Sequence, residues 1–133
     1  MNDVLFRELV DSIQKCRKFC PWTRSQTVDT FARELHGEAA EVLNAVDKKD
    51  IANLREELGD VVWDALMTAH IAEEHGLFTK EEIIQDVVAK MKRRKPYAFE
   101  GRTVTIEEAG KMWVDVKKKE KLLNVKNNSS SHG

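Results

Sequence analysis

The sequence predicts an all-α protein, an antiparallel bundle of about five helices. Only two prolines and six glycines occur in 133 residues, so few residues interrupt long helices, and the many turns of an all-β fold are missing. Apolar residues recur at spacings of three and four along most of the chain, which is the period of an amphipathic helix. The 41% of hydrophobic residues beside 34% of charged ones suits helices with one buried face and one solvated face.

The first two helices are defined by their flanking residues. The first is expected to begin near Asp3 or Asn2, either of which can cap it, and to end near Phe19, before a turn at 20–22. The second is expected to begin after Thr27, whose hydroxyl can accept a hydrogen bond from a free backbone N–H group. Its apolar residues continue at helical spacing to Val46.

Three further helices follow. A short polar connection at 47–50 leads into the third, so the second and third helices should be antiparallel neighbours, and Gly76 suits the position just past the end of the third. Thr79 and Thr105 are each followed three residues later by a glutamate, which is the capping-box signature for the fourth and fifth helices. Pro96 ends the fourth helix.

The length predicts one domain. We expect it to cover residues 1–121, because 122–133 lacks an apolar pattern and is expected to be a disordered tail. No apolar run approaches the roughly 20 residues of a membrane span, and the N-terminus lacks the apolar region of a secretory signal. Cys16 and Cys20 are interpreted as reduced thiols. The cytoplasm is therefore the expected location.

Acidic residues form two pairs on the second and third helices. Glu38 with Glu41 and Glu57 with Asp60 are each three residues apart, so the members of a pair point the same way. None of the four has a lysine or arginine three or four residues away. Two carboxylates about 4 Å apart repel by about 1 kcal/mol in water and about 4 kcal/mol at an effective dielectric near 20, so a convergent quartet favours a divalent cation.

The ligand atoms in such a cluster would all be hard carboxylate oxygens, which favour Mg²⁺, with Mn²⁺ as a substitute, over zinc. On spacing alone, a solvated helix face is the favoured interpretation, because acids are frequent throughout this chain. The net charge of −1 also conceals an acidic middle at 34–64 and a basic end at 90–126. A site that holds both a cation and a polyphosphate would have this distribution.

Four ordered motifs between Cys20 and Glu120 resemble those of the MazG family of nucleoside triphosphate pyrophosphohydrolases. They are Cys20-Pro21-Trp22 with Gln26-Thr27; Glu38-Ala39-Ala40-Glu41 with Glu56-Glu57-Leu58-Gly59-Asp60; Arg93-Arg94-Lys95-Pro96-Tyr97-Ala98-Phe99; and Trp113 with Lys117. The resemblance implies an all-α fold completed by homo-oligomerisation, as a homodimer or homotetramer. It also implies Mg²⁺-dependent cleavage of a ribo- or deoxyribonucleoside triphosphate between the α and β phosphates, giving the monophosphate and pyrophosphate.

The resemblance also implies roles for individual residues. Carried over by position, the metal ligands and catalytic acids are Glu38, Glu41, Glu57 and Asp60. The residues expected to contact the nucleotide are Lys90, Arg94, Trp113 and Lys117, and Trp22 of the first motif is a further candidate.

Two positions depart from the family pattern. Gly37 stands where the family has the first of two adjacent glutamates, and Thr23 replaces the aspartate after Cys-Pro-Trp. Glu34, one turn before Glu38, is a candidate replacement for the missing acid. Because of Gly37, an alternative function stays open: a catalytically weakened helical module for nucleotide sensing or protein association.

Nucleic-acid binding through the lysine-rich segment 117–121 is not expected, since that segment lacks aromatic residues and the chain is not basic. No membrane partner is expected either.

Overall fold

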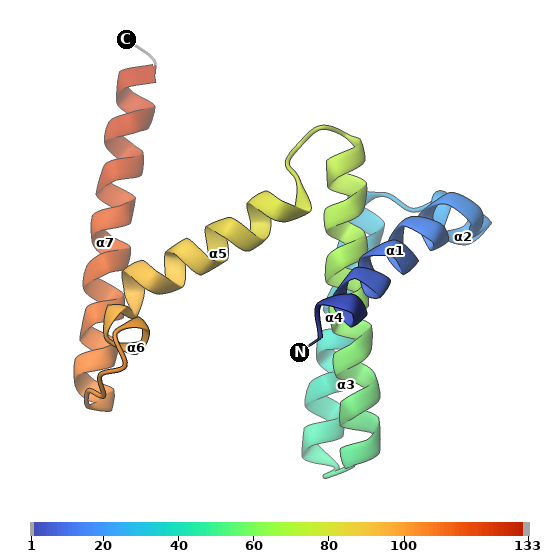
Figure 1. The fold of residues 1–133 in the computed structure, drawn as a ribbon, viewed down its shortest axis with the longest axis horizontal. Helices are drawn as coiled ribbons and strands as arrows, with labels where there is room; N and C mark the ends of the chain where they lie inside the picture. Colours follow the sequence, from blue (N-terminus) through green and yellow to red (C-terminus); the bar gives the residue numbers. More distant parts are fainter. Residues whose placement is uncertain (1, 132–133) are drawn as a thin grey trace. The chain divides into compact units, whose positions relative to one another are not determined.

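The computed structural model describes the backbone of residues 2–131 and the side chains of residues 2–125, and this part of the chain is helical without strands (Figure 1). Its helices are α1 (Asp3–Phe19), α2 (Pro21–Arg24), α3 (Val28–Asp47), α4 (Ile51–Glu74), α5 (Lys80–Arg94), α6 (Pro96–Phe99) and α7 (Ile106–Ser131). The predicted all-α class is confirmed. The short helices α2 and α6 add to the five expected, and each begins with a proline, whose missing N–H group costs nothing at the first helical position.

The predicted helix starts are also found. The side chain of Asn2 accepts a hydrogen bond from Val4 N, and Thr27 and Thr30 cap each other at the start of α3. The hydroxyls of Thr79 and Thr105 accept hydrogen bonds at 3.1 Å from the backbone N–H groups of the glutamates three residues on. Local sequence therefore set the boundaries of the long helices.

Contacts divide the chain into two units, Met1–Glu82 and Ile83–Gly133. In the first unit, α3 and α4 lie side by side and antiparallel, joined by a tight turn, and α1 packs against α2 and α4 (Figure 1). Its buried core consists of Ile13, Phe31, Met67 and Ile71, with Cys16, Val28, Trp63 and Leu66 packed against them. Trp63 is partly buried and packs against this core.

Part of the apolar stripe expected to face the core is on the surface. Leu43 and Val46 of α3 are 62% and 51% exposed, and Leu58 and Val62 of α4 are 47% and 49% exposed. The expectation that these residues are buried is wrong for the single chain. Within the first unit, α1 and α2 do not cover this part of the α3–α4 pair.

In the second unit, α5 and α7 are joined by side-chain ion pairs and a cation–π contact, and no residue in 83–125 is buried. Helix α7 runs past Lys121 to Ser131, through most of the segment for which disorder was expected, while His132 and Gly133 lie outside the described residues. The domain boundary at 121 stays a prediction. No helix among the described residues is both long enough and apolar enough to span a membrane.

Candidate metal and nucleotide site

Three of the four predicted acids meet between α3 and α4. Glu38 of α3 and Glu57 and Asp60 of α4 each offer a carboxylate oxygen, and these oxygens lie within 4.8 Å of one another. The fourth acid, Glu41, lies outside this group of three, yet its charge still acts on Glu57. We call Glu38, Glu57 and Asp60 the acidic triad.

The triad forms because the α3–α4 turn fixes the register of the two helices. Lys49 takes a left-handed backbone conformation, with φ of 55°, which reverses the chain within a few residues. Asp50 then caps α4 by accepting a hydrogen bond from Asn53 N. With the helices held antiparallel from this point, Glu38 lies opposite the turn of α4 that carries Glu57 and Asp60.

The pKa of Glu57 is raised to about 7. The largest cause is its hydrogen bond with the carboxyl of Glu38, followed by burial and by repulsion from Glu38, Asp60 and Glu41. Among the described residues, no lysine or arginine forms an ion pair with any of these acids. The triad therefore holds negative charge that only a proton or a cation can neutralise, and its all-oxygen donor set fits Mg²⁺ or Mn²⁺.

Asp64 extends the acidic strip one helical turn beyond Asp60. It is buried, 8% exposed, and its pKa is raised to about 6, first by burial and then by the charges of Glu34 and Asp60. Helical spacing alone places Asp64 on the same face of α4 as Asp60, and Glu34 on the same face of α3 as Glu38. It could not reveal the burial of Asp64, which depends on tertiary packing.

The predicted nucleotide-binding residues of the second unit fall into two groups. Arg94 and Trp113 are in contact, with the guanidinium carbon 4.6 Å from the centre of the indole ring, and the ammonium of Lys95 lies 5.5 Å from the same ring. Lys90 is half-buried on α5 and Lys117 is exposed on α7, and neither belongs to an ion pair among the described residues.

Trp22, the remaining predicted contact, belongs to the first unit. It is 54% exposed and meets the ring of Phe31 edge-on, with ring centres 5.7 Å apart and an interplanar angle of 64°. Phe31 is part of the buried core, so Trp22 is held by one edge while much of its ring stays accessible.

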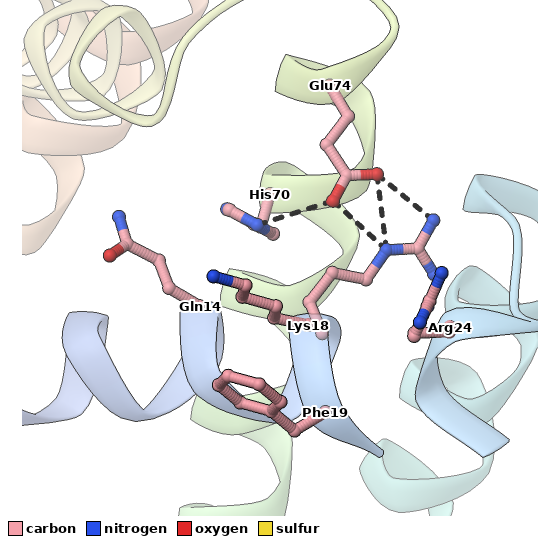
Figure 2. Close-up of a pocket in the computed structure, with 7 residues that line it drawn as sticks. Gln14, Lys18, Phe19, Arg24, His70 and Glu74 are labelled. Carbon is pink, nitrogen blue, oxygen red and sulfur yellow. Dashed lines mark hydrogen bonds and ion pairs between the residues drawn. The ribbon is translucent and has the colours of Figure 1, made fainter. Parts of the chain in front are cut away.

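A hollow of the first unit lies away from the triad. It has a volume of about 750 Å³ and lies between α1, the α2 region and the end of α4, where Lys18, Phe19, Arg24, His70 and Glu74 line it (Figure 2). Since Asp60 and His70 are ten residues apart on one helix, the hollow and the triad are roughly 15 Å apart along α4.

Arg17 also lines this hollow. Its guanidinium donates to both carboxylate oxygens of Glu74, at 3.0–3.1 Å, and to the backbone carbonyls of Thr23 and Gln26, at 2.6 and 3.0 Å. Arg17 therefore ties α1 to α4 and to the segment between α1 and α3, and its donors serve the fold.

The described part of the chain is therefore all-helical and carries between two antiparallel helices an acidic triad whose oxygen donors fit a divalent cation. The family model of the MazG nucleotide pyrophosphohydrolase domain matches residues 26–99, which include the triad. The chain belongs to this MazG nucleotide pyrophosphohydrolase family.

Individual relatives agree with this assignment. The chain is 37% identical to the nucleoside triphosphate pyrophosphohydrolase/pyrophosphatase MazG of Thermotoga maritima, over 89% of this chain and 46% of that protein. It is 33% identical to the nucleoside triphosphate pyrophosphohydrolase of Escherichia coli, over 77% of this chain and 39% of the relative. The chain thus spans less than half the length of these curated relatives.

A solved structure supports the fold directly. The crystal structure of a mazG-related protein from Thermotoga maritima superposes with a TM-score of 0.78 at 39% sequence identity. The match covers 84% of this chain and 98% of the solved one. The helical arrangement of this chain is therefore that of a known MazG-related structure.

Proposed function

We propose that the protein is a Mg²⁺-dependent nucleotide pyrophosphohydrolase, which cleaves a nucleoside triphosphate between the α and β phosphates and releases the monophosphate and pyrophosphate. The observation that carries this proposal is the convergence of Glu38, Glu57 and Asp60 without a basic partner. Membership of the MazG family, and similarity to nucleoside triphosphate pyrophosphohydrolases of Thermotoga maritima and Escherichia coli, support the reaction class. We place the activity in the cytoplasm, on free nucleotides.

The acidic triad would hold the ion, and Glu41, which is exposed and next to it, would complete the ligand set. Bound Mg²⁺ supplies positive charge that polarises the phosphate oxygens and makes water more acidic. A carboxylate oxygen of the cluster that the ion does not engage would accept the proton of the attacking water.

Basic residues of the second unit would bind the phosphate chain. Lys90 and Arg94 are four residues apart on α5, so their side chains lie on the same face of the helix. Arginine can hold two phosphate oxygens at once, whereas lysine acts as a point charge. Lys117 adds a third positive charge, and Trp113 and Trp22 are the aromatic surfaces proposed to contact the nucleotide.

We further infer that the protein assembles with itself, as a homodimer or homotetramer. The exposed leucines and valines on α3 and α4 continue the apolar faces of these helices, and the second unit has no buried residue in 83–125. Exposed apolar faces of this kind are typical of helices that pack against another protein surface. Val62→Asp should dissociate the assembly in analytical ultracentrifugation, while Val4→Asp on α1 should leave the sedimentation coefficient unchanged.

Product analysis tests the proposed reaction. The purified chain is incubated with a panel of ribo- and deoxyribonucleoside triphosphates and millimolar Mg²⁺, and the products are separated by ion-exchange chromatography. Monophosphate and pyrophosphate in equal amounts are expected, and EDTA should stop their release. Orthophosphate with nucleoside diphosphate would contradict the proposed bond cleavage. Nucleotide binding without any product would instead fit the nucleotide-sensing alternative.

A further inference from the structure

Two neighbouring arginines at the end of α5 hold one carboxylate of α7. Arg94 Nη2 lies 2.7 Å from Glu120 Oε2, and Arg93 Nε lies 3.0 Å from Glu120 Oε1. Each carboxylate oxygen is thus bound by a different guanidinium. The two guanidiniums lower the pKa of Glu120, Arg94 more strongly than Arg93, so the carboxylate is ionised at neutral pH.

The Arg94 side chain is held in a defined position but is incompletely bonded. It is only 11% exposed, and its guanidinium lies against the ring of Trp113. Its Nε is buried and has no hydrogen-bond partner among the residues whose side chains the structure describes. A guanidinium has five N–H donors, of which Glu120 takes one, so Arg94 keeps unused capacity for an anion.

Arg93, Arg94 and Glu120 together also carry a net positive charge. Two arginines and one glutamate sum to +1, and Lys95 adds a further charge on the same indole ring. A simple structural ion pair would need only one cation for one carboxylate. Two guanidiniums that converge on one pair of oxygens form an arrangement that binds phosphate equally well, because both anions offer paired oxygens to charged N–H donors.

We propose that Arg93 and Arg94 form a phosphate clamp that Glu120 occupies in the free protein, and that a polyphosphate displaces Glu120 when it binds. The identity of the natural ligand, a nucleoside triphosphate, rests on the proposed function. The clamp itself rests on the contacts of Arg93, Arg94 and Glu120. A phosphate chain carries more charge and more acceptor oxygens than one carboxylate, so it competes successfully for both arginines.

Glu120→Gln tests the clamp, because it removes the competing charge and keeps the shape of the side chain. Binding of inorganic tripolyphosphate is measured by titration calorimetry in EDTA, without divalent cation and without turnover. The variant should bind about tenfold more tightly than the wild type, which corresponds to the loss of one charged competitor. Asp115→Asn, which removes an exposed acid of the same helix that contacts neither arginine, is the matched control and should change the affinity by less than about twofold.

A purely structural ion pair predicts the opposite direction. If Glu120 only orients the arginines, then Glu120→Gln weakens tripolyphosphate binding, and weaker or unchanged binding overturns the proposal. Arg93→Gln in the Glu120→Gln background should cancel the gain; a gain that persists also overturns it. If Glu120→Gln does not fold, Glu120→Asp serves instead, since its shorter side chain loosens the contact and should give a smaller gain. This assay does not depend on hydrolysis, so failure of the clamp and failure of the proposed reaction are separate outcomes.

Discussion

Glu57 of α4 and Glu38 of α3 bring carboxylate oxygens within 4.8 Å of each other, although both side chains are acids. A proton on one of the two carboxyls relieves their repulsion, and the proximity of Glu38 raises the pKa of Glu57 to about 7. A divalent cation between the two helices would replace that proton. Folding stability should therefore depend both on pH and on metal binding at these two carboxyls.

Removal of a single charge from the triad should abolish activity while the fold persists. We expect Glu57→Gln and Asp60→Asn each to lower kcat at least about 100-fold, because each removes a ligand charge from the cation site. Both variants should melt at or above the wild-type temperature in EDTA, since each relieves repulsion within the triad. Turnover is measured by pyrophosphate release. Glu56→Gln, an exposed neighbour outside the triad, should retain activity, and equal loss in this control would mean that the effect is not specific to the site.

The metal-free protein should lose stability as the pH rises from about 4.5 to about 7. The pKa of Glu57 is about 7 in the folded chain against 4.5 for an unperturbed glutamate, so the folded state binds the proton more tightly than the unfolded state. Stability from a raised pKa is present at low pH and is lost as the pH rises through the folded value. Thermal melts in EDTA at a series of pH values measure this loss of stability. The Glu57→Gln variant should lack the part of the pH dependence that comes from Glu57.

Mg²⁺ should reverse this pH dependence. The ion competes with the proton at the triad, so the increase in Tm on adding millimolar Mg²⁺ should be larger at about pH 8 than at about pH 6.5. A Tm that does not change on adding Mg²⁺ or Mn²⁺, at either pH, would argue against a metal site.

Gly37 offers space for the acid that the family pattern has there. A Cβ at this position would meet no atom within 4 Å, and the residue lies within α3. Gly37→Ala should therefore stabilise the fold by about 0.5–1 kcal/mol in urea denaturation, because alanine loses less backbone entropy in a helix. Gly37→Glu should fold equally well.

The comparison of the two Gly37 variants isolates the effect of the charge. If an accessory acid assists the triad, Gly37→Glu should raise the Mg²⁺ affinity above that of Gly37→Ala. Equal affinities for the two variants would mean that the added acid contributes nothing at this position.

Arg17 should be important for folding stability. Arg17→Met keeps the aliphatic part of the side chain and removes every hydrogen bond to Glu74 and to the two carbonyls. We expect a loss of about 2–4 kcal/mol in the free energy of unfolding, since the change leaves partly buried acceptors without a donor. Lys18→Met, at the exposed neighbouring position, should change stability by less than about 0.5 kcal/mol. A small effect at Arg17 would mean that water replaces the lost donors.

The sequence alone determined the helices and the composition of the acidic site. Threonine caps, Asn2, Gly76 and Pro96 set local backbone geometry, and those interactions act within a few residues of one another. The spacing of Glu38, Glu57 and Asp60, with the resemblance to MazG proteins, selected the acids that the structure brings together. Each of these signals is local, or recurs at a fixed spacing along one helix, so it can be read without knowledge of the tertiary structure.

Only the tertiary structure decided which side chains meet across helices. It placed Glu41 outside the acidic triad, buried Asp64, packed Trp63 against the core and joined Glu120 to Arg93 and Arg94. None of these outcomes follows from helical periodicity, because periodicity fixes the direction of a side chain only relative to its own helix axis. Burial and charge pairing depend on the rotation and register of one helix against another, and these are set by packing between residues far apart in the chain.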